Sequence, residues 1–179
     1  YLHHYPVRRL EAEAVRDAVL AASGRLDRTL FGESIAPHRQ EPTEHRRLFQ
    51  GPLDGNGRRS IYLKITRMEG PRFLETFDFP APLQTRGNRD MTNVPSQALA
   101  MWNDPFVHQQ ARVWAEALVR RRDDTVDARL TAMFLRALGR EPVAAELAGY
   151  RAMLGSLGGV ELEKVELWQR VAHTLFNSK

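Results

Sequence analysis

The sequence predicts a mainly α-helical fold, an irregular helical bundle that carries a long loop region. Apolar residues recur at spacings of three and four over residues 8–23 and over most of the chain from residue 95 onward. Between these stretches, glycines and prolines interrupt the chain repeatedly, as is typical of loops. A chain of 179 residues with 42% hydrophobic content suits one domain, because a domain of this size buries about 70% of its unfolded surface. We expect one domain in three parts: an N-terminal helix at 1–24, a loop-rich basic segment at 25–94 and a helical bundle at 95–177.

The N-terminal helix is expected at residues 8–23, with Gly24 as its stop. Helical periodicity is then lost up to residue 57. Within this region Asp54-Gly-Asn-Gly57 is a strong turn signal, and the run 60–66 that follows has the β-branched and aromatic content of a strand. A short β-strand or hairpin is therefore expected near 58–67.

Four apolar residues, three of them aromatic, lie in the proline-bounded stretch 71–82: Phe73, Leu74, Phe77 and Phe79. We interpret them as side chains that pack an irregular loop onto the core, because burial of large aromatic rings is strongly stabilising. The alternative is that rings beside arginines stack on bases or sugars.

From residue 95 the pattern predicts a succession of helices joined by short linkers, so neighbours in sequence should pack antiparallel. The first covers 95–102. Asp104 and Pro105 then supply an N-cap and a first-turn proline. The next helix starts at Asp124 or Thr125 and stops at Gly139, and two further helices follow, one after Glu141-Pro142 and one carrying Leu162 to Leu175. The helices differ in length and show no fixed repeat, which favours a bundle over a solenoid.

The formal net charge of +4 comes from one part of the chain. Residues 46–89 hold nine basic and four acidic side chains, a net charge of +5. Such a cluster can attract anionic partners, although a solvated face with local ion pairs is the alternative. The residues that would bind an acidic or sulfated polysaccharide or another polyanion are Arg58, Arg59, Arg67, Arg72, Arg86 and Arg89, with Tyr62 and Phe73.

Motifs for catalysis are absent from the sequence. There is no cysteine, no HExxH, no Gly-x-Ser-x-Gly and no phosphate-binding glycine loop, so we expect no metal and no cofactor in this segment. An enzyme remains as a third hypothesis, with a site among charged residues of the loop-rich region: Glu75, Asp78, Arg86 and Asp90. No helix combines a basic face with a recognition-helix turn, and no apolar run is long enough to cross a bilayer. We therefore expect neither nucleic-acid binding nor membrane insertion.

Several stretches occur together in a familiar order. They are Arg8-Arg-Leu-Glu-Ala-Glu-Ala-Val-Arg-Asp-Ala-Val-Leu20, Arg59-Ser-Ile-Tyr-Leu63, Phe73-Leu-Glu-Thr-Phe-Asp-Phe-Pro80, Asn93-Val-Pro-Ser-Gln-Ala-Leu99, Asn103-Asp-Pro-Phe-Val107, Ala137-Leu-Gly-Arg-Glu-Pro142 and Thr174-Leu-Phe-Asn-Ser178. This sequence resembles the C-terminal domain of unknown function of large planctomycete proteins that also carry cytochrome c-like haem domains. The resemblance extends over most of the chain.

The resemblance implies a context. It suggests that the chain is a segment of a larger exported, extracytoplasmic protein, with haem c attached elsewhere in that protein because this segment has no CxxCH motif. The partners it implies are the upstream domains of the same protein, including the cytochrome c-like ones. It supplies no catalytic residues. We therefore expect a non-catalytic interaction or scaffold module, with polyanion or glycan binding through the basic segment as the alternative.

Overall fold

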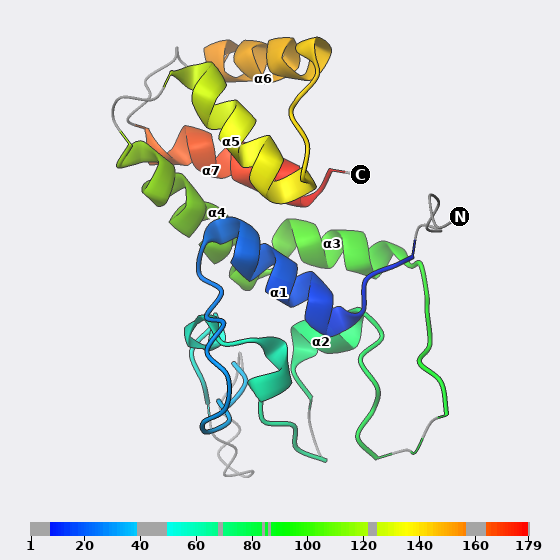
Figure 1. The fold of residues 1–179 in the computed structure, drawn as a ribbon. Helices are drawn as coiled ribbons and strands as arrows, with labels where there is room; N and C mark the ends of the chain where they lie inside the picture. Colours follow the sequence, from blue (N-terminus) through cyan, green and yellow to red (C-terminus); the bar gives the residue numbers. More distant parts are fainter. Residues whose placement is uncertain are drawn as a thin grey trace, which may run out of the picture.

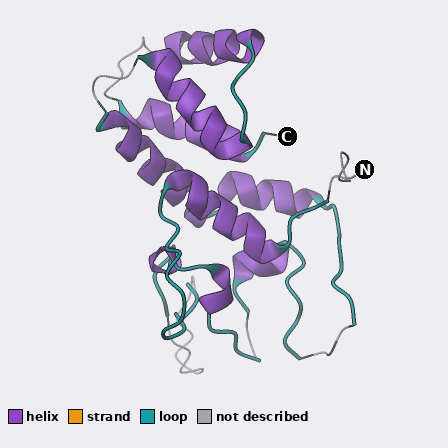
Figure 2. Cartoon of the chain, viewed as in Figure 1, coloured by secondary structure: helices purple, strands orange, loops and turns teal. Residues whose placement is uncertain are grey.

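The structure is a computed structural model that describes residues 8–38, 50–67, 70–83, 85, 87–121, 125–156 and 164–178. These residues form helices joined by loops, without a strand (Figure 2). The elements are α1 (Ala12–Ser23), the 3-10 helices η1 (Gly55–Gly57) and η2 (Ser60–Tyr62), α2 (Arg72–Thr76), α3 (Pro95–Asn103), α4 (Pro105–Val119), α5 (Val126–Leu138), α6 (Ala144–Ser156) and α7 (Val165–Phe176). The mainly α-helical fold predicted from the sequence is confirmed. None of the helices among these residues is long and apolar enough to cross a bilayer.

Helix ends follow the capping residues that the sequence offered. The Asp104 carboxylate accepts a hydrogen bond from the Phe106 amide at 2.8 Å, and Pro105 opens α4. The Thr125 hydroxyl accepts one from the Ala128 amide at 3.2 Å at the start of α5. Gly24 closes α1 in the left-handed conformation, which glycine adopts without steric cost.

The main core lies between α4, α5 and α7. Figure 1 shows α5, α6 and α7 on one side of α4 and α1, and the loop-rich segment on the other side of α1. Helices α4 and α7 share the most extensive helix–helix contact. Fully buried members of this core are Trp114, Leu130, Met133, Phe134, Trp168 and Val171. Each such side chain contributes about 1.5–3 kcal/mol when removed from water, so this core is the main source of stability.

A second apolar region holds the loop-rich segment against α1. Leu74 of α2 is fully buried, and Phe77 is nearly so. The ring of Phe73 lies 5.1 Å from that of Phe77 and 5.2 Å from that of Phe106, measured between centroids. The predicted packing of these aromatic residues onto the core is confirmed. The stretch is more regular than expected, because five of its residues form helix α2.

The expected strand or hairpin near 58–67 is wrong. Residues 60–62 form the 3-10 helix η2, and the flanking residues make only two isolated parallel bridges, Asp27 with Arg58 and Ile35 with Leu63. The cause is the preceding turn. Asn56 and its two glycine neighbours all have positive φ angles, so the chain curls beside α1 instead of folding back into a hairpin. The residues with strand-like composition instead pair with residues 27–35 through these two bridges.

Candidate functional site

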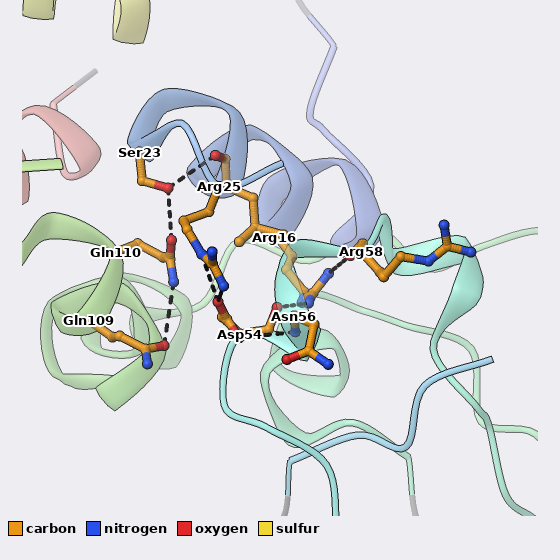
Figure 3. Close-up of polar contacts among 9 residues, drawn as sticks. Arg16, Ser23, Arg25, Asp54, Asn56, Arg58, Gln109 and Gln110 are labelled. Atoms are coloured by element: carbon orange, nitrogen blue, oxygen red, sulfur yellow. Dashed lines mark hydrogen bonds and ion pairs between the residues drawn. The ribbon is translucent and has the colours of Figure 1, made fainter. Parts of the chain in front are cut away.

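A buried arginine on α1 holds the segment that contains Arg58 and Arg59, two of the predicted binding residues. Arg16 is only 5% exposed. Its guanidinium donates to the carbonyl oxygens of Asp54 at 2.8 Å and Arg58 at 3.0 Å (Figure 3). It also donates to the Ser60 hydroxyl at 3.1 Å. Burial lowers the pKa of Arg16, while the charges of Asp17 and Asp54 raise it. The side chain thus stays paired while it fixes residues 54–60 against the helix.

Two carboxylates complete this network. The Asp54 carboxylate accepts two hydrogen bonds from Arg25, at 3.0 and 2.7 Å, and one from the Asn56 amide at 3.0 Å. Asp17 accepts from the amide and the hydroxyl of Ser60, at 2.8 and 2.7 Å. The turn must pass very close to Arg16, because a Cβ on Gly55 would lie 2.6 Å from its Nη2 atom. This close approach explains the glycine in the Asp54-Gly-Asn-Gly57 turn.

Arg58 and Tyr62 form a clamp on the loop that follows α1. In Figure 3 the Arg58 side chain points away from Arg16. It donates to the carbonyl oxygens of Thr29 at 2.9 Å and Phe31 at 2.6 Å, and its Cζ lies 4.0 Å from the centroid of the Tyr62 ring. The Tyr62 hydroxyl oxygen accepts a hydrogen bond from the Phe31 amide at 2.7 Å. Both backbone polar groups of Phe31 are therefore held in place.

The clamped loop presents apolar side chains to solvent. Phe31 is 79% exposed and has a φ of 66°, in the left-handed region. That conformation costs a residue other than glycine about 1–2 kcal/mol. Leu30 and Ile61, on the two segments that the clamp joins, are also largely exposed. The Arg58–Tyr62 clamp thus maintains an aromatic side chain in a strained backbone without burying it.

The structure describes seven of the eight sequence-predicted binding residues and places them in several different local environments. Arg58 and Tyr62 meet in the clamp, and Phe73 points into the core. Arg89 lies against the first turn of α1, where its guanidinium forms two hydrogen bonds with the Glu13 carboxylate, at 2.7 and 3.0 Å. This pairing lowers the pKa of Glu13, against the raising effect of burial.

The remaining three cations among the described candidates are exposed. Arg59 follows the clamp residue, Arg67 lies beyond η2, and Arg72 opens α2. Arg86 lies outside the described residues. Among the described candidates, Arg58, Phe73 and Arg89 therefore belong to three different local contacts.

Two carboxylates that the enzymatic hypothesis named, Glu75 and Asp78, accept hydrogen bonds from backbone amides of loops. Glu75 accepts from the Gly70 amide at 3.1 Å. Asp78 accepts from the amide and hydroxyl of Thr92, at 2.8 and 2.7 Å, and these bonds lower its pKa. Asp90 is exposed, and Arg86 lies outside the described residues. Across the described ranges no group of three or more His, Asp or Glu side chains could hold a metal ion.

A histidine pair links helices that are distant in sequence. The rings of His108 and His173 stack with centroids 4.5 Å apart and an interplanar angle of 19°. Trp102, at the end of α3, lies 4.8 Å from the His173 ring. The sequence gives no signal of the contact between His108 and His173, because the two residues lie on separate helices.

The sequence analysis also missed the exposed apolar residues around Phe31. It weighed charge between residues 46 and 89, whereas the exposed aromatic lies upstream at Phe31-Gly32. The sequence signal that could have indicated it is Phe31 directly before Gly32, in a stretch without helical periodicity. Its exposure depends on Arg58 and Tyr62, which are about 30 residues away along the chain.

Comparison with known families gives a match over most of the chain. The PSD1 family, described as a protein of unknown function (DUF1553), matches residues 1–154. The chain belongs to this family. No curated protein and no solved structure matches the chain. The DUF1553 match ends within α6, so α7, which packs most extensively on α4, lies beyond it.

Proposed function

We propose that this DUF1553 chain is a non-catalytic interaction module that contacts its partner through the Phe31 loop, defined here as Leu30, Phe31 and Ile61. The observation that carries the proposal is the exposed Phe31 held at a φ of 66°. A strained, solvent-exposed aromatic side chain contributes little to folding, and such strain is typically retained where it serves a function. Aromatic side chains are also common centres of protein interfaces.

The surroundings of the Phe31 loop define the chemistry of the partner. Arg28 and Arg59 are exposed on the two segments that carry Phe31 and Ile61. Arg58 instead donates its hydrogen bonds to the carbonyl oxygens of Thr29 and Phe31. A complementary surface would offer an apolar pocket for the aromatic ring and carboxylates at its rim. We propose that this surface belongs to upstream domains of a larger exported planctomycete protein, including its cytochrome c-like domains. The family resemblance supports that context, and haem c would be attached in those domains.

The test is binding between this chain and the separately expressed upstream domains, measured by calorimetry. Phe31→Asn removes the ring and supplies a residue that tolerates the left-handed conformation. We expect it to weaken binding by about tenfold or more, the loss typical of an interface hot spot. The matched control is Leu83→Asn, which removes an apolar side chain that is 72% exposed in another loop. Equal effects of the two substitutions would contradict the proposal.

A second candidate function is binding of an acidic or sulfated polysaccharide. It is favoured by the exposure of Arg59 and Arg67. An open depression of about 620 Å³ is lined by Ala36 and by four residues with polar side chains, Glu33, Ser34, Gln50 and Lys64. Affinity for a sulfated polysaccharide should then fall steeply with salt and should be lost in Arg59→Gln with Arg67→Gln. Affinity that is insensitive to both changes would rule this function out.

A further inference from the structure

The ends of three helices meet at the His108–His173 pair. Trp102 ends α3, His108 lies in the first turns of α4, and His173 lies in the last turn of α7. The His173 ring contacts both other rings. Asn177, one turn after His173, donates to the Met101 carbonyl at 3.4 Å and so adds a second link between α7 and the end of α3.

His173 is placed where a positive charge is unfavourable. The residue is 9% exposed, and its Nε2 atom is sealed from solvent without a hydrogen-bond partner. Burial lowers the pKa of His173, and the charge of His108 lowers it further. Hydrogen bonding to the backbone of Trp102 and Met101 raises it, but the net direction is downward. The neutral ring is therefore the form that this packing accommodates.

The charged groups around the pair come from two of the three helices. On α4 they are His108 itself and Asp104, one turn earlier at the N-cap. Burial raises the pKa of Asp104, whereas the charges of Arg72, His38 and His108 lower it. On α7 the neighbouring charge is Arg170, which is exposed one turn before His173. Residues 95–103 of α3 carry no titratable side chain. The pair thus has Arg170 as a cationic neighbour on α7, and one carboxylate, Asp104, that is shared with other cations.

We propose that the stacked His108–His173 pair is an acid-sensitive latch, which holds the end of α3 against α7 while both rings are neutral and releases it when they are protonated. Two protonated rings 4.5 Å apart would repel each other at close range. Separation of the rings requires His173 to reach solvent, and this breaks its contact with Trp102. The expected result is local opening of residues 99–103 and 173–177 in mildly acidic solution, with the α4–α5 core intact.

Two measurements on the whole chain test the latch. Ring proton resonances give the titration of His173 by NMR, and it should occur below that of a free histidine. Amide exchange, corrected for its intrinsic pH dependence, should show protection at residues 99–103 falling on the order of tenfold between pH 7.5 and 5.5. Protection at residues 130–134 of α5 should change less than twofold. Normal titration of His173, or uniform protection changes in both helices, would overturn the proposal.

Substitutions separate the latch from a general effect of acid. His173→Phe keeps an aromatic ring in the stack but cannot be protonated, so protection of residues 99–103 should no longer depend on pH. His108→Gln provides a second test if that variant folds poorly, and it should reduce the pH-dependent loss at least threefold. His38→Gln is the control for the surrounding charge, because His38 acts on Asp104 and contacts the Gly51 carbonyl rather than the stack. An unchanged acid response in both latch variants would contradict the inference.

Discussion

The guanidinium of Arg16 donates a hydrogen bond to the carbonyl oxygen of Asp54, 38 residues away, inside the protein at 2.8 Å. The side-chain carboxylate of Asp54 in turn binds Arg25. One buried cation thereby fixes a turn whose downstream residues, Arg58 and Tyr62, shape the Phe31 loop. The proposed binding surface therefore depends on a contact that is itself far from solvent.

Loss of Arg16 should destabilise the protein strongly. Arg16→Ala removes four hydrogen bonds and leaves the Asp54 and Arg58 carbonyl groups without this donor. We expect the free energy of unfolding to fall by about 3 kcal/mol in urea denaturation. The control is Arg112→Ala on α4, whose ion pair with Glu116 is largely exposed and contributes about 0.5 kcal/mol or less. Similar losses in both variants would show that Arg16 does not organise the loop.

Gly55 should tolerate no side chain. Gly55→Ala places a Cβ atom 2.6 Å from Arg16 Nη2, at a left-handed φ of 59°. We expect a loss of about 1–3 kcal/mol. Gly149→Ala is the matched control in α6, where an added Cβ meets no atom within 4 Å and helix propensity favours alanine by about 1 kcal/mol. Thermal denaturation should show a lower melting temperature for Gly55→Ala and a higher one for Gly149→Ala. An unchanged melting temperature for Gly55→Ala would contradict the close approach to Arg16.

Phe31→Asn should stabilise the isolated chain while it weakens partner binding. Asparagine adopts the left-handed conformation more readily than phenylalanine, and the exposed ring gains little from folding. We expect the free energy of unfolding to rise by about 0.5 kcal/mol. A decrease of similar size would mean that the ring packs productively, and that the strain needs no functional explanation.

Sequence reasoning succeeded where structure depends on near neighbours. The helix starts at Asp104 and Thr125 follow from side chains that accept hydrogen bonds from amides within three residues, and the helix end at Gly139 follows from the left-handed backbone that glycine adopts. It failed at residues 58–67, where composition favoured a strand but three consecutive positive φ angles redirect the chain. The Phe31 clamp and the His108–His173 stack join residues 27 to 65 positions apart, and no local pattern encodes such contacts.

Stability should fall as pH decreases below neutrality, through His173. Its folded-state pKa is lowered, chiefly by burial, so the unfolded chain binds a proton first as pH falls below about 6.5. The contribution of His173 to the free energy of unfolding is therefore fully present above that pH. It is lost progressively as the pH falls to the lower folded-state pKa. Burial raises the pKa of Asp104, so its protonation as the pH falls increases the free energy of unfolding. The difference in urea midpoint between the wild type and His173→Phe isolates the histidine, and a constant difference across pH would contradict this account.

Helix α7 should be required for folding although the DUF1553 match stops before it. Trp168 and Val171 are buried in the main core beside Trp114 of α4. A chain ending at residue 154 exposes that face of α4, and we expect it to lose cooperative thermal unfolding and to bind a hydrophobic dye. A cooperative transition in the shortened chain would show instead that α7 is an accessory helix.

The central claim is that Phe31 contacts a partner domain, and site-specific photo-cross-linking tests it most directly. A photoreactive phenylalanine analogue is placed at position 31, or at position 83 as a control, in the longer protein proposed above. Mass spectrometry of the cross-linked peptides then identifies what each position touches. The account predicts cross-links from position 31 to upstream domains and few from position 83. Equal yields from the two positions, or cross-links from position 31 only to water and its own loop, would contradict it.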